Sequence, residues 1–297
     1  MKEAFTDKLG LSPINAELLD TINEILERYA AQGYRLTLRQ LFYALVTENI
    51  IENSKAEYQK LSKILTKGRM AGIVDWSMIE DRGRQVYVPY YAFDPADALG
   101  DIIGSYRLNR QRDQANYVEV WCEKDALSQI LKRVTTYFHV PLMINKGYSS
   151  SSAMYEAARR INNKIEYGAD TATVIYVGDH DPSGRDMKRD ITARFEDFNC
   201  YPNVDMVALT YEQIERYNPP ENKLKKDDFG KLKDPRGKAY FEEFGNRSWE
   251  VDALRPEVLD KLIRAKIEEN IDMNQFKEVL GQEAADIKKL KDFAETL

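Results

Sequence analysis

Two carboxylates spaced two residues apart, Asp179 and Asp181, follow an apolar run at residues 173–177 and precede a proline and a glycine. On an extended chain alternate residues share one face, so both side chains can point the same way. Carboxylates this close repel each other and should not both stay ionised without a cation. Hard oxygen ligands suit Mg²⁺, which usually binds one or two carboxylates together with substrate phosphate oxygens. The competing interpretation is that Asp179, Asp181 or Ser183 is the N-cap of a helix at residues 185–198.

A third acidic residue, Glu123, ends an apolar stretch at residues 117–122 that is typical of a strand. From here to residue 209, expected strands alternate with expected helices, which predicts a parallel α/β sheet. The expected strands are 117–122, 141–144, 173–177 and 204–209, and the expected helices are 126–138, 152–165 and 185–198. Binding sites in such sheets lie beyond the carboxyl ends of the strands. Glu123 and the two aspartates all fall there, where three acids can hold one or two divalent ions over a phosphate. Without the aspartate pair, Glu123 is better explained as an ordinary strand-end acid.

Three helices are expected before this sheet, at residues 15–31, at 37–48 and from 54 onward. Thr37 and Gln40 form a capping-box pattern, and Ser54 and Glu57 repeat it. Helices joined by short connections outline a helix-turn-helix, and a tight turn at 81–84 before alternating valines predicts a wing. The third helix would then be the recognition helix. The expected DNA-binding residues are Lys55, Lys60, Lys63, Lys67 and Arg69 on this helix and Arg82 and Arg84 in the wing.

The charge pattern bears on this interpretation, because the chain as a whole carries a net charge of −6. Residues 33–92 contain nine basic and six acidic residues, a local excess of three positive charges. A local patch, and not the total charge, decides where a phosphate can dock. Ordinary scatter of charge over a solvated surface explains the same numbers equally well.

Tyr43 is a candidate nucleophile. At 100° per residue, one apolar stripe of the second helix spans about 140°; its members are Leu38, Leu41, Phe42, Leu45 and Val46. Tyr43 falls outside this stripe, on the side of Arg39, and is therefore not expected in the core. Arg39 lies one turn earlier and could steady a phosphate or favour the phenolate, whose free pKa is near 10. Attack of a tyrosine oxygen on a phosphodiester stores the broken bond in a covalent intermediate. The alternative is one surface tyrosine among the 18 in the chain.

These residues resemble a known family. A Glu that ends one strand and an Asp-x-Asp that ends a later strand resemble the Toprim domain of topoisomerases, primases and some nucleases. The run DHDPSG at 179–184 is similar to the form found in topoisomerase VI A subunits and their meiotic double-strand-break relatives. The run RQLFY at 39–43 resembles the motif that carries the cleaving tyrosine in their winged-helix domain, although Gln40 stands where the family usually has an acid. The run WEVDAL at 249–254 resembles an acidic element late in the same subunits.

The resemblance implies an α/β fold class in which a mostly helical winged-helix domain at residues 1–112 precedes a Toprim-like parallel α/β domain at 113–297 with a helical C-terminal tail. It implies that Glu123, Asp179 and Asp181 bind Mg²⁺, with Mn²⁺ as an alternative ion, and that Glu123 acts as ligand or as acid and base. Tyr43 and Arg39 would complete the catalytic set. The chain is shorter than typical A subunits and resembles a compact, stand-alone relative.

The same resemblance implies partners. The substrate would be double-stranded DNA, and the protein would act as a homodimer in which Tyr43 of one chain serves the acidic site of the other. Strand passage would need a separate ATPase subunit of the B type, because the glycines around residues 178–184 lack the spacing of a P-loop and no ATP site is encoded. Two alternatives stay open: a Toprim nuclease that hydrolyses DNA without using Tyr43, and a non-catalytic winged-helix DNA-binding protein.

The remaining features bound the class of protein. The length of 297 residues suggests roughly two domains. No apolar run approaches the ~18 residues that span a bilayer, and the N-terminus lacks the apolar core of a signal peptide, so a cytoplasmic, nucleoid-associated protein without membrane contact is expected. Cys122 and Cys200 fit reduced thiols. Residues 94–115 are expected to be a connecting segment, residues 218–238 a loop, and the tail from Pro256 helical.

Overall fold

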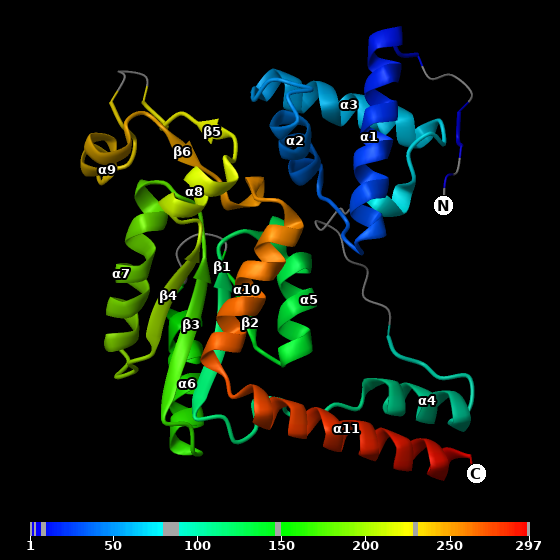
Figure 1. The fold of residues 1–297 in the computed structure, drawn as a ribbon, viewed down its shortest axis with the longest axis vertical. Coiled ribbons are helices and arrows are strands. Elements are labelled where there is room, and N and C mark those ends of the chain that lie inside the picture. Colours follow the sequence, from blue (N-terminus) through cyan, green and yellow to red (C-terminus); the bar gives the residue numbers. More distant parts are fainter. Residues whose placement is uncertain are drawn as a thin grey trace.

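Four parallel strands in the order β2-β1-β3-β4 form the central sheet of the computed structural model, which describes residues 2, 4–6, 10–79, 89–145, 150–227 and 231–295 (Figure 1). All neighbouring pairs are parallel, so the carboxyl ends of the strands meet at one edge. The predicted parallel α/β sheet is therefore confirmed. The strands are β1 (Asn116–Cys122), β2 (Leu142–Ile144), β3 (Thr171–Val177) and β4 (Asn203–Ala208).

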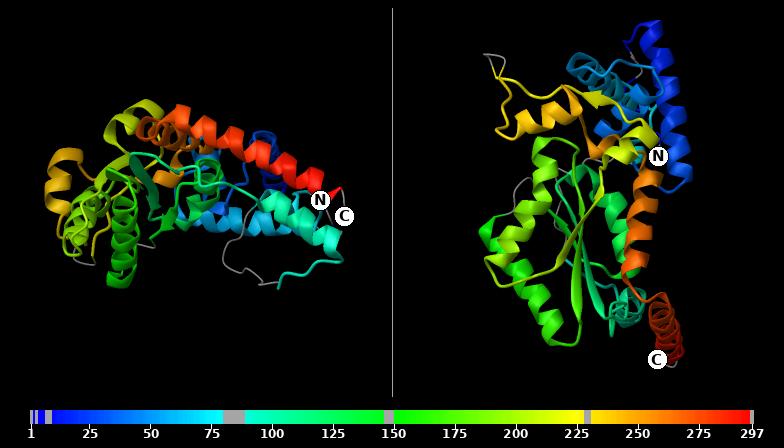
Figure 2. Two further views of the ribbon diagram at one scale, coloured as in Figure 1. Left: turned by 90° about the horizontal axis from the view of Figure 1, so that it is seen from below. Right: turned by 60° about the vertical axis from the view of Figure 1, so that its left-hand side comes forward.

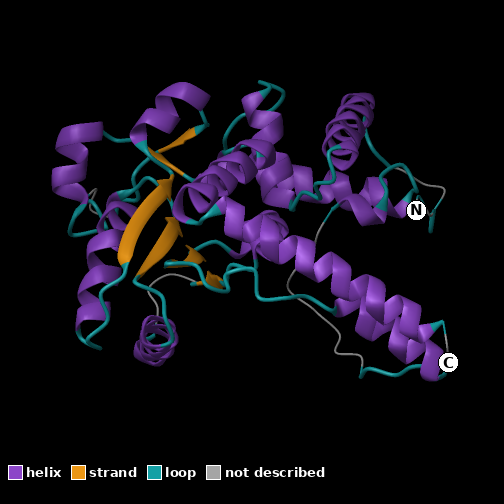
Figure 3. Cartoon of the chain, turned by 60° about the horizontal axis from the view of Figure 1, so that its bottom comes forward, coloured by secondary structure: helices purple, strands orange, loops and turns teal. Residues whose placement is uncertain are grey.

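Helices cover both faces of this sheet (Figures 2 and 3). Alternate residues of β1 point to opposite faces: Val120 packs with the cluster on the side of α5 and α10, and Trp121 packs with the cluster on the side of α6 and α7. The result is three layers with two apolar interfaces. The covering helices are α5 (Ser128–Phe138), α6 (Ser151–Glu166), α7 (Pro182–Glu196) and α10 (Pro256–Asn270), and a short 3₁₀ turn, η2 (Asp125–Leu127), precedes α5.

The three predicted N-terminal helices are present: α1 (Pro13–Ala31), α2 (Leu38–Thr47) and α3 (Lys55–Met70). The capping box of α2 is complete, because Thr37 accepts from the Gln40 amide while the Gln40 side chain accepts from the Thr37 amide. At α3 only one of the two capping-box hydrogen bonds forms, in which Ser54 accepts from the Glu57 amide. A 3₁₀ turn, η1 (Trp76–Met78), follows. The predicted wing at 81–88 lies outside the described residues.

The segment 94–115 is not simply a connection, because it contains α4 (Pro95–Ser105). The signals for this helix were present: Asp94 accepts from the Asp97 amide as N-cap, and Pro95 occupies the first turn. α4 packs against the long C-terminal helix α11 (Met273–Ala294), and the two lie side by side in Figures 1 and 2. After α4 in the chain, Arg110 forms a buried ion pair with Glu283 of α11, with an N–O distance of 2.6 Å. This ion pair connects the segment to α11. The predicted helical tail is confirmed by α10 and α11.

The stretch after β4 holds more structure than the predicted loop. β5 (Glu221–Asn222) pairs antiparallel with β6 (Ser248–Trp249), and this small sheet lies at the carboxyl edge of the main sheet (Figure 1). Leu224, Tyr240 and Phe244 form a separate small apolar core beside it. No strand was predicted here, because β5 and β6 are only two residues long. The accompanying elements are α8 (Tyr211–Tyr217), α9 (Gly237–Phe244) and the 3₁₀ turn η3 (Val251–Ala253).

Two expectations about the whole chain can be compared with the described residues. Cys122 and Cys200 are both buried and unpaired, in agreement with reduced thiols. Within the described ranges, no helix combines the length and the apolar character that crossing a membrane requires.

Gly184 in the first turn of α7 gives a test of how closely this helix approaches β3. A Cβ atom at this position would lie 1.9 Å from the carbonyl oxygen of Asp179. We expect Gly184→Ala to lower the free energy of unfolding by about 3 kcal/mol or more, because backbone has to move to relieve the overlap. Urea unfolding measures the change.

The matched control is Gly281→Ala in α11, where a Cβ atom would meet nothing within 4 Å. This substitution should raise the free energy of unfolding by about 0.5–1 kcal/mol, through the lower helix propensity of glycine. Equal effects of the two substitutions would contradict the close approach of α7 to β3.

Candidate functional site

An ion cluster lies at the carboxyl edge of the sheet, around the ammonium group of Lys124. Lys124 Nζ lies 2.9 Å from Asp179 Oδ2, 3.1 Å from Glu250 Oε2 and 3.7 Å from Asp252 Oδ1. Lys124 directly follows Glu123 at the end of β1, Asp179 follows β3, and the other two acids flank the start of η3. Three carboxylates from two separate stretches of chain thus surround one cation.

Arg39 of α2 completes the cluster from the other side. Its guanidinium pairs with Glu250 and, at 2.9 Å, with Asp252. The Asp252 side chain is fully buried, whereas that of Arg39 is 41% exposed. The cluster therefore joins the helical N-terminal part to the sheet. We call the five residues Arg39, Lys124, Asp179, Glu250 and Asp252 the edge cluster.

Burial sets the protonation of the edge cluster. Burial raises the pKa of Asp179 to about 7 and that of Asp252 to about 6, although Lys124 opposes both shifts. Burial also acts to raise the pKa of Glu250, but Lys124 and Arg39 outweigh it and the pKa is lowered. For Lys124, burial favours the neutral amine, yet the three carboxylates raise its pKa and keep it protonated. The cluster thus contains more carboxylates than cations, and Asp179 and Asp252 are the carboxylates whose ionised form is most disfavoured.

Glu123 and Asp179 are brought together, as the sequence analysis predicted. Glu123 Oε1 accepts from the Asp179 backbone amide at 3.4 Å, and its Oε2 accepts from the Tyr176 hydroxyl at 3.2 Å. The register of the strands explains this proximity, because Cys122 at the end of β1 pairs with Val177 at the end of β3. The carboxyl group of Glu123 therefore lies beside the backbone of the Asp179–Asp181 stretch.

Asp181 has the structural role that was the competing interpretation. Its Oδ1 accepts from the Gly184 amide at 2.7 Å and from the Ser183 hydroxyl at 2.8 Å, so it is the N-cap of α7. The helix consequently begins at Pro182, three residues before the expected start at 185. No described residue donates a hydrogen bond to the other carboxylate oxygen, Oδ2. Capping and metal binding can therefore coexist in this side chain.

The fit of a divalent ion to these acids is partial. Among the residues that the structure describes, no three His, Cys, Asp or Glu side chains are arranged to hold a metal ion. The donors are hard oxygens of the kind that Mg²⁺ prefers, and Asp181 Oδ2 is available. Asp179 Oδ2, however, is paired with Lys124. Binding of an ion by Glu123, Asp179 and Asp181 therefore requires the Lys124 ammonium to move away from Asp179.

Tyr43 is buried, with 4% of its surface exposed, so the expectation that it lies outside the core was wrong. The helical projection identified one apolar stripe of α2, but the opposite side of the helix is covered by the sheet part of the chain. Two donors reach the Tyr43 oxygen, each at 3.4 Å: Arg39 Nη2 and Asn222 Nδ2. Burial and the charge of Glu250 raise the Tyr43 pKa to about 12, and Arg39 only partly offsets them. The expected preference for the phenolate is thus not found in this arrangement.

The basic residues predicted to bind DNA lie mainly on the exposed side of α3. Lys55, Lys60, Lys63 and Lys67 are exposed, while Leu61, Ile64 and Leu65 face the core, as expected. Arg69 is half-buried and stacks on Trp76 at 4.2 Å. Arg82 and Arg84 lie outside the described residues, so their contribution stays a prediction.

Two adjoining cavities open on this region. The first, of about 300 Å³, is lined by Tyr43, Asn53 and Lys55 among others, and we call it the tyrosine cavity. The second, of about 690 Å³, is lined by Lys124, Asp179 and Asp181 among others, and we call it the acid cavity. The shared lining residues are Arg39, Asn222 and Glu250. The candidate nucleophile and two of the candidate metal ligands, Asp179 and Asp181, therefore face neighbouring spaces on the two sides of one small group of residues.

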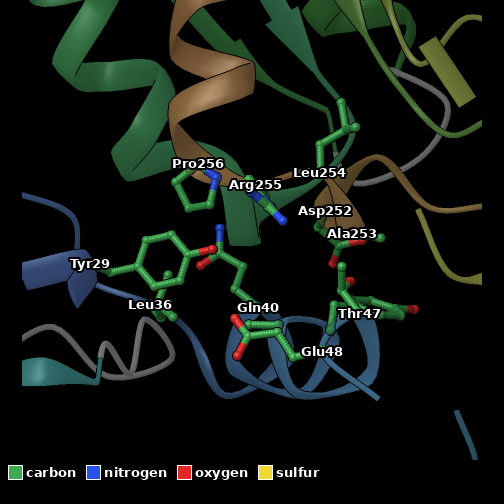
Figure 4. A pocket seen from close by; sticks show the side chains of 12 residues that line it. Tyr29, Leu36, Gln40, Thr47, Glu48, Asp252, Ala253, Leu254, Arg255 and Pro256 are labelled. Carbon is green, nitrogen blue, oxygen red and sulfur yellow. The ribbon is translucent and has the colours of Figure 1, made fainter. Parts of the chain in front are cut away.

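A third, smaller cavity of about 20 Å³ lies between α2 and the residues that lead into α10 (Figure 4). Gln40, where the resembled family usually has an acid, lines this cavity together with Asp252. The Gln40 side chain is buried, and its Nε2 has no hydrogen-bond partner among the described residues. Its side-chain oxygen closes the capping box of α2. Gln40 thus supports the helix that presents Arg39 and Tyr43.

Several residues of the site were missed or left undecided by the sequence analysis. The acidic element at 249–254 was noted, but only the tertiary structure shows that Glu250 and Asp252 contact Lys124. Lys124 itself carried one signal, a basic residue between two acids directly after a strand. Asn222, which donates to Tyr43, carried none, because β5 was expected to be loop.

Removal of the central cation gives a test with a pH dependence. We expect Lys124→Met to lower the free energy of unfolding by about 3–5 kcal/mol near about pH 8, because three carboxylates then lie together with only Arg39 as partner. The folded-state pKa values of Asp179 and Asp252 are raised above their unfolded values, so their protonation stabilises the folded state at low pH and this contribution is lost as pH rises through about 6 and about 7. The penalty should therefore shrink toward about pH 5.

Urea unfolding at several pH values measures this effect, and Lys124→Arg is the control that keeps the positive charge. A penalty that is independent of pH, or equal in the two variants, would show that Lys124 acts through packing and not through charge.

Comparison of this chain with models of protein families gives no match, and comparison with curated protein sequences gives none either. The likeness to topoisomerase VI A subunits thus rests on the motifs at residues 39–43 and 179–184 and on Glu123.

Proposed function

We propose that this chain is a Mg²⁺-dependent DNA-cleaving transesterase of the type IIB topoisomerase A-subunit kind, with Tyr43 as nucleophile. One observation carries the proposal: a continuous series of contacts runs from Tyr43 through Arg39 to Glu250 and Asp252, and on through Lys124 to Asp179. The motif at 39–43 and the acids after β1 and β3 are far apart in sequence. Their convergence is what a joint role in one reaction requires.

The surrounding architecture supports the same proposal. A bundle of three helices with exposed lysines on α3 is compatible with a winged-helix domain at residues 1–112. A parallel sheet with Glu123 and Asp179 at its carboxyl edge is compatible with a Toprim domain at 113–297. On this proposal the substrate is double-stranded DNA in the cytoplasm, at the nucleoid, and strand passage needs a separate ATPase subunit.

The proposed step is an exchange of phosphoester bonds. The Tyr43 oxygen attacks a backbone phosphorus, a new P–O bond to the tyrosine forms, and the bond from phosphorus to a ribose oxygen breaks. The phenolic proton passes to solvent, and the departing ribose alkoxide takes a proton from solvent. No net oxidation occurs, and the reverse exchange reseals the DNA.

Charged groups of the edge cluster have defined roles in this step. Arg39 lies beside the tyrosine oxygen and can bind a non-bridging phosphate oxygen. Glu123, Asp179 and Asp181 would hold the divalent ion, once Lys124 has moved from Asp179 to the incoming phosphate. When bound, Mg²⁺ or Mn²⁺ supplies Lewis-acid stabilisation of charge on the phosphate.

The burial of Tyr43 adds a condition to the proposal. A phosphate of a DNA duplex cannot reach an oxygen in a side chain that is 4% exposed unless α2 separates from β5 and η3. The contacts that hold this closed arrangement include the Arg39 ion pairs and the Asn53 side chain, which donates to the Glu221 carbonyl at 2.8 Å. Separation would also allow Tyr43 to serve the acids of a second chain, as a homodimer would require.

A second candidate function is hydrolysis of DNA by a metal-activated water, as in a Toprim nuclease. The observation in its favour is the protonated, buried state of Tyr43, whose pKa is raised to about 12. Asp179 and Asp181 face the acid cavity, so a phosphate could reach them without passing Tyr43. The two candidates differ in whether a protein–DNA adduct forms.

Tyr43→Phe separates the two candidates. Supercoiled plasmid is incubated with the protein and Mg²⁺ or Mn²⁺ and quenched with detergent, and covalent adduct and strand breaks are both measured. The transesterase proposal expects that the adduct is lost with Tyr43→Phe, because the attacking oxygen is missing. Tyr58→Phe is the matched control, since Tyr58 lines the same cavity and should keep the adduct.

Cutting that survives Tyr43→Phe without any adduct in the wild type would favour the nuclease. The absence of both cutting and adduct in the wild type under either ion would leave only a DNA-binding protein.

Asp181 allows capping to be separated from metal binding. Serine is also a good N-cap, so Asp181→Ser should keep the free energy of unfolding within about 0.5 kcal/mol, whereas Asp181→Ala should lower it by about 1 kcal/mol. Both variants should lose metal-dependent cutting, because both lack the carboxylate. Calorimetric titration with Mg²⁺ and urea unfolding provide the measurements. Full cutting by Asp181→Ser would remove Asp181 from the metal site.

A further inference from the structure

Three lysines of the stretch between β5 and α9 line the acid cavity. These residues, Lys223, Lys225 and Lys233, are exposed, and we call them the cavity lysines. Lys223 and Lys225 directly follow β5, and Lys233 returns beside them, because its amide donates to the Lys225 carbonyl at 3.0 Å. The three side chains thus come from two described stretches, 223–227 and 231–233, that lie side by side next to the candidate metal ligands.

These two stretches pack against the small apolar core at the edge of the main sheet. Leu224, between two cavity lysines, is buried in the small core with Tyr240 and Phe244, and Leu232 packs against the same core. His180, between the two aspartates of the DHD motif, contacts Tyr240 through a hydrogen bond of 2.8 Å and pairs with Trp249 through two backbone hydrogen bonds. The positions of the cavity lysines relative to Asp179 are therefore fixed by packing.

The cavity lysines are the cations of the acid cavity that have no ion-pair partner among the described residues. Its other two cations, Arg39 and Lys124, are ion-paired in the edge cluster, and its Asp234 pairs with Arg236. No described carboxylate forms an ion pair with a cavity lysine. Three ammonium groups thus face a space of about 690 Å³ without a partner among the described residues. Positive groups that converge on an open cavity favour a polyanion.

We propose that the cavity lysines bind the sugar–phosphate backbone of DNA and lead it past Asp179. Through Arg39, Asn222 and Glu250 the acid cavity adjoins the tyrosine cavity, whose lining includes Lys55 at the start of α3. The DNA backbone would thus follow one track, from α3 across the edge cluster to the cavity lysines. The inference rests on the proposed function and adds a second DNA-contacting surface to the α3 lysines.

Binding of DNA to the full-length chain without divalent metal tests the inference. Fluorescence anisotropy of a short labelled duplex is followed between about 50 and about 200 mM salt. The test variant carries Lys223→Gln, Lys225→Gln and Lys233→Gln. Each lost phosphate contact should make the slope of log K against log salt shallower by about 0.9, so a reduction of about 2 to 3 is expected.

The matched control carries Lys226→Gln, Lys231→Gln and Lys238→Gln. These lysines are also exposed; Lys226 and Lys231 come from the same stretch and Lys238 from the start of α9, but none of them lines the acid cavity. The control removes the same charge, and its slope should stay within about 1 of the wild type. Circular dichroism and thermal unfolding establish that both triple variants are folded.

Equal reductions in both triple variants would overturn the inference, because general charge and not the cavity would then be responsible. An unchanged slope in the test variant would overturn it as well. The result is distinct from the fate of the proposed function. If the salt dependence becomes shallower in the test variant but the wild-type protein never cuts DNA, the inference stands and the proposed function fails. If the test variant binds DNA with the wild-type salt dependence and cuts DNA like the wild type, the inference fails and the proposed function stands.

Discussion

The charge balance around the Lys124 ammonium is the constraint on which the remaining structure depends. Three carboxylates converge on this single cation at the edge of the sheet, where burial makes an unpaired charge expensive. One lysine does not neutralise three acids, and Arg39 of α2 supplies the second cation. The docking of the N-terminal helices and the electrostatics of the acidic edge are therefore one interaction. Any ligand that changes the charge at this edge also changes how firmly α2 is held.

The coupling between this charge balance and the docking of α2 has two opposing effects on Tyr43. The same docking that brings Tyr43 close to the acids also buries its oxygen and raises its pKa to about 12. A phosphate or a divalent ion at the edge would compete with the ion pairs that close the site. Entry of substrate and exposure of the tyrosine are thus expected to accompany each other, as a population shift between closed and open arrangements. His180 lies outside this exchange, in an aromatic cluster that fixes β6 and α9 above the sheet.

Local patterns predicted the elements that bury one regular face. The alternation of strands and helices between 117 and 209 appears as the parallel sheet, and the capping box at Thr37 and Gln40 starts α2 where expected. Prediction failed where structure depends on distant partners. α4 buries none of its residues deeply and packs on α11, far along the chain, and β5 needs β6 to be a strand at all. A two-residue strand carries no periodicity that a sequence pattern could reveal.

For the site, the sequence alone determined which chemical groups stand at the strand ends: Glu123 and Asp179 come together because parallel strands share one carboxyl edge. Only the tertiary structure decided how those groups are used. It assigned Asp181 to the cap of α7, placed Lys124 among the acids, and buried Tyr43 against Asn222. The physical reason is that spacing along one element fixes the face on which a side chain lies. Charge pairing and burial depend on what a distant segment places opposite that face.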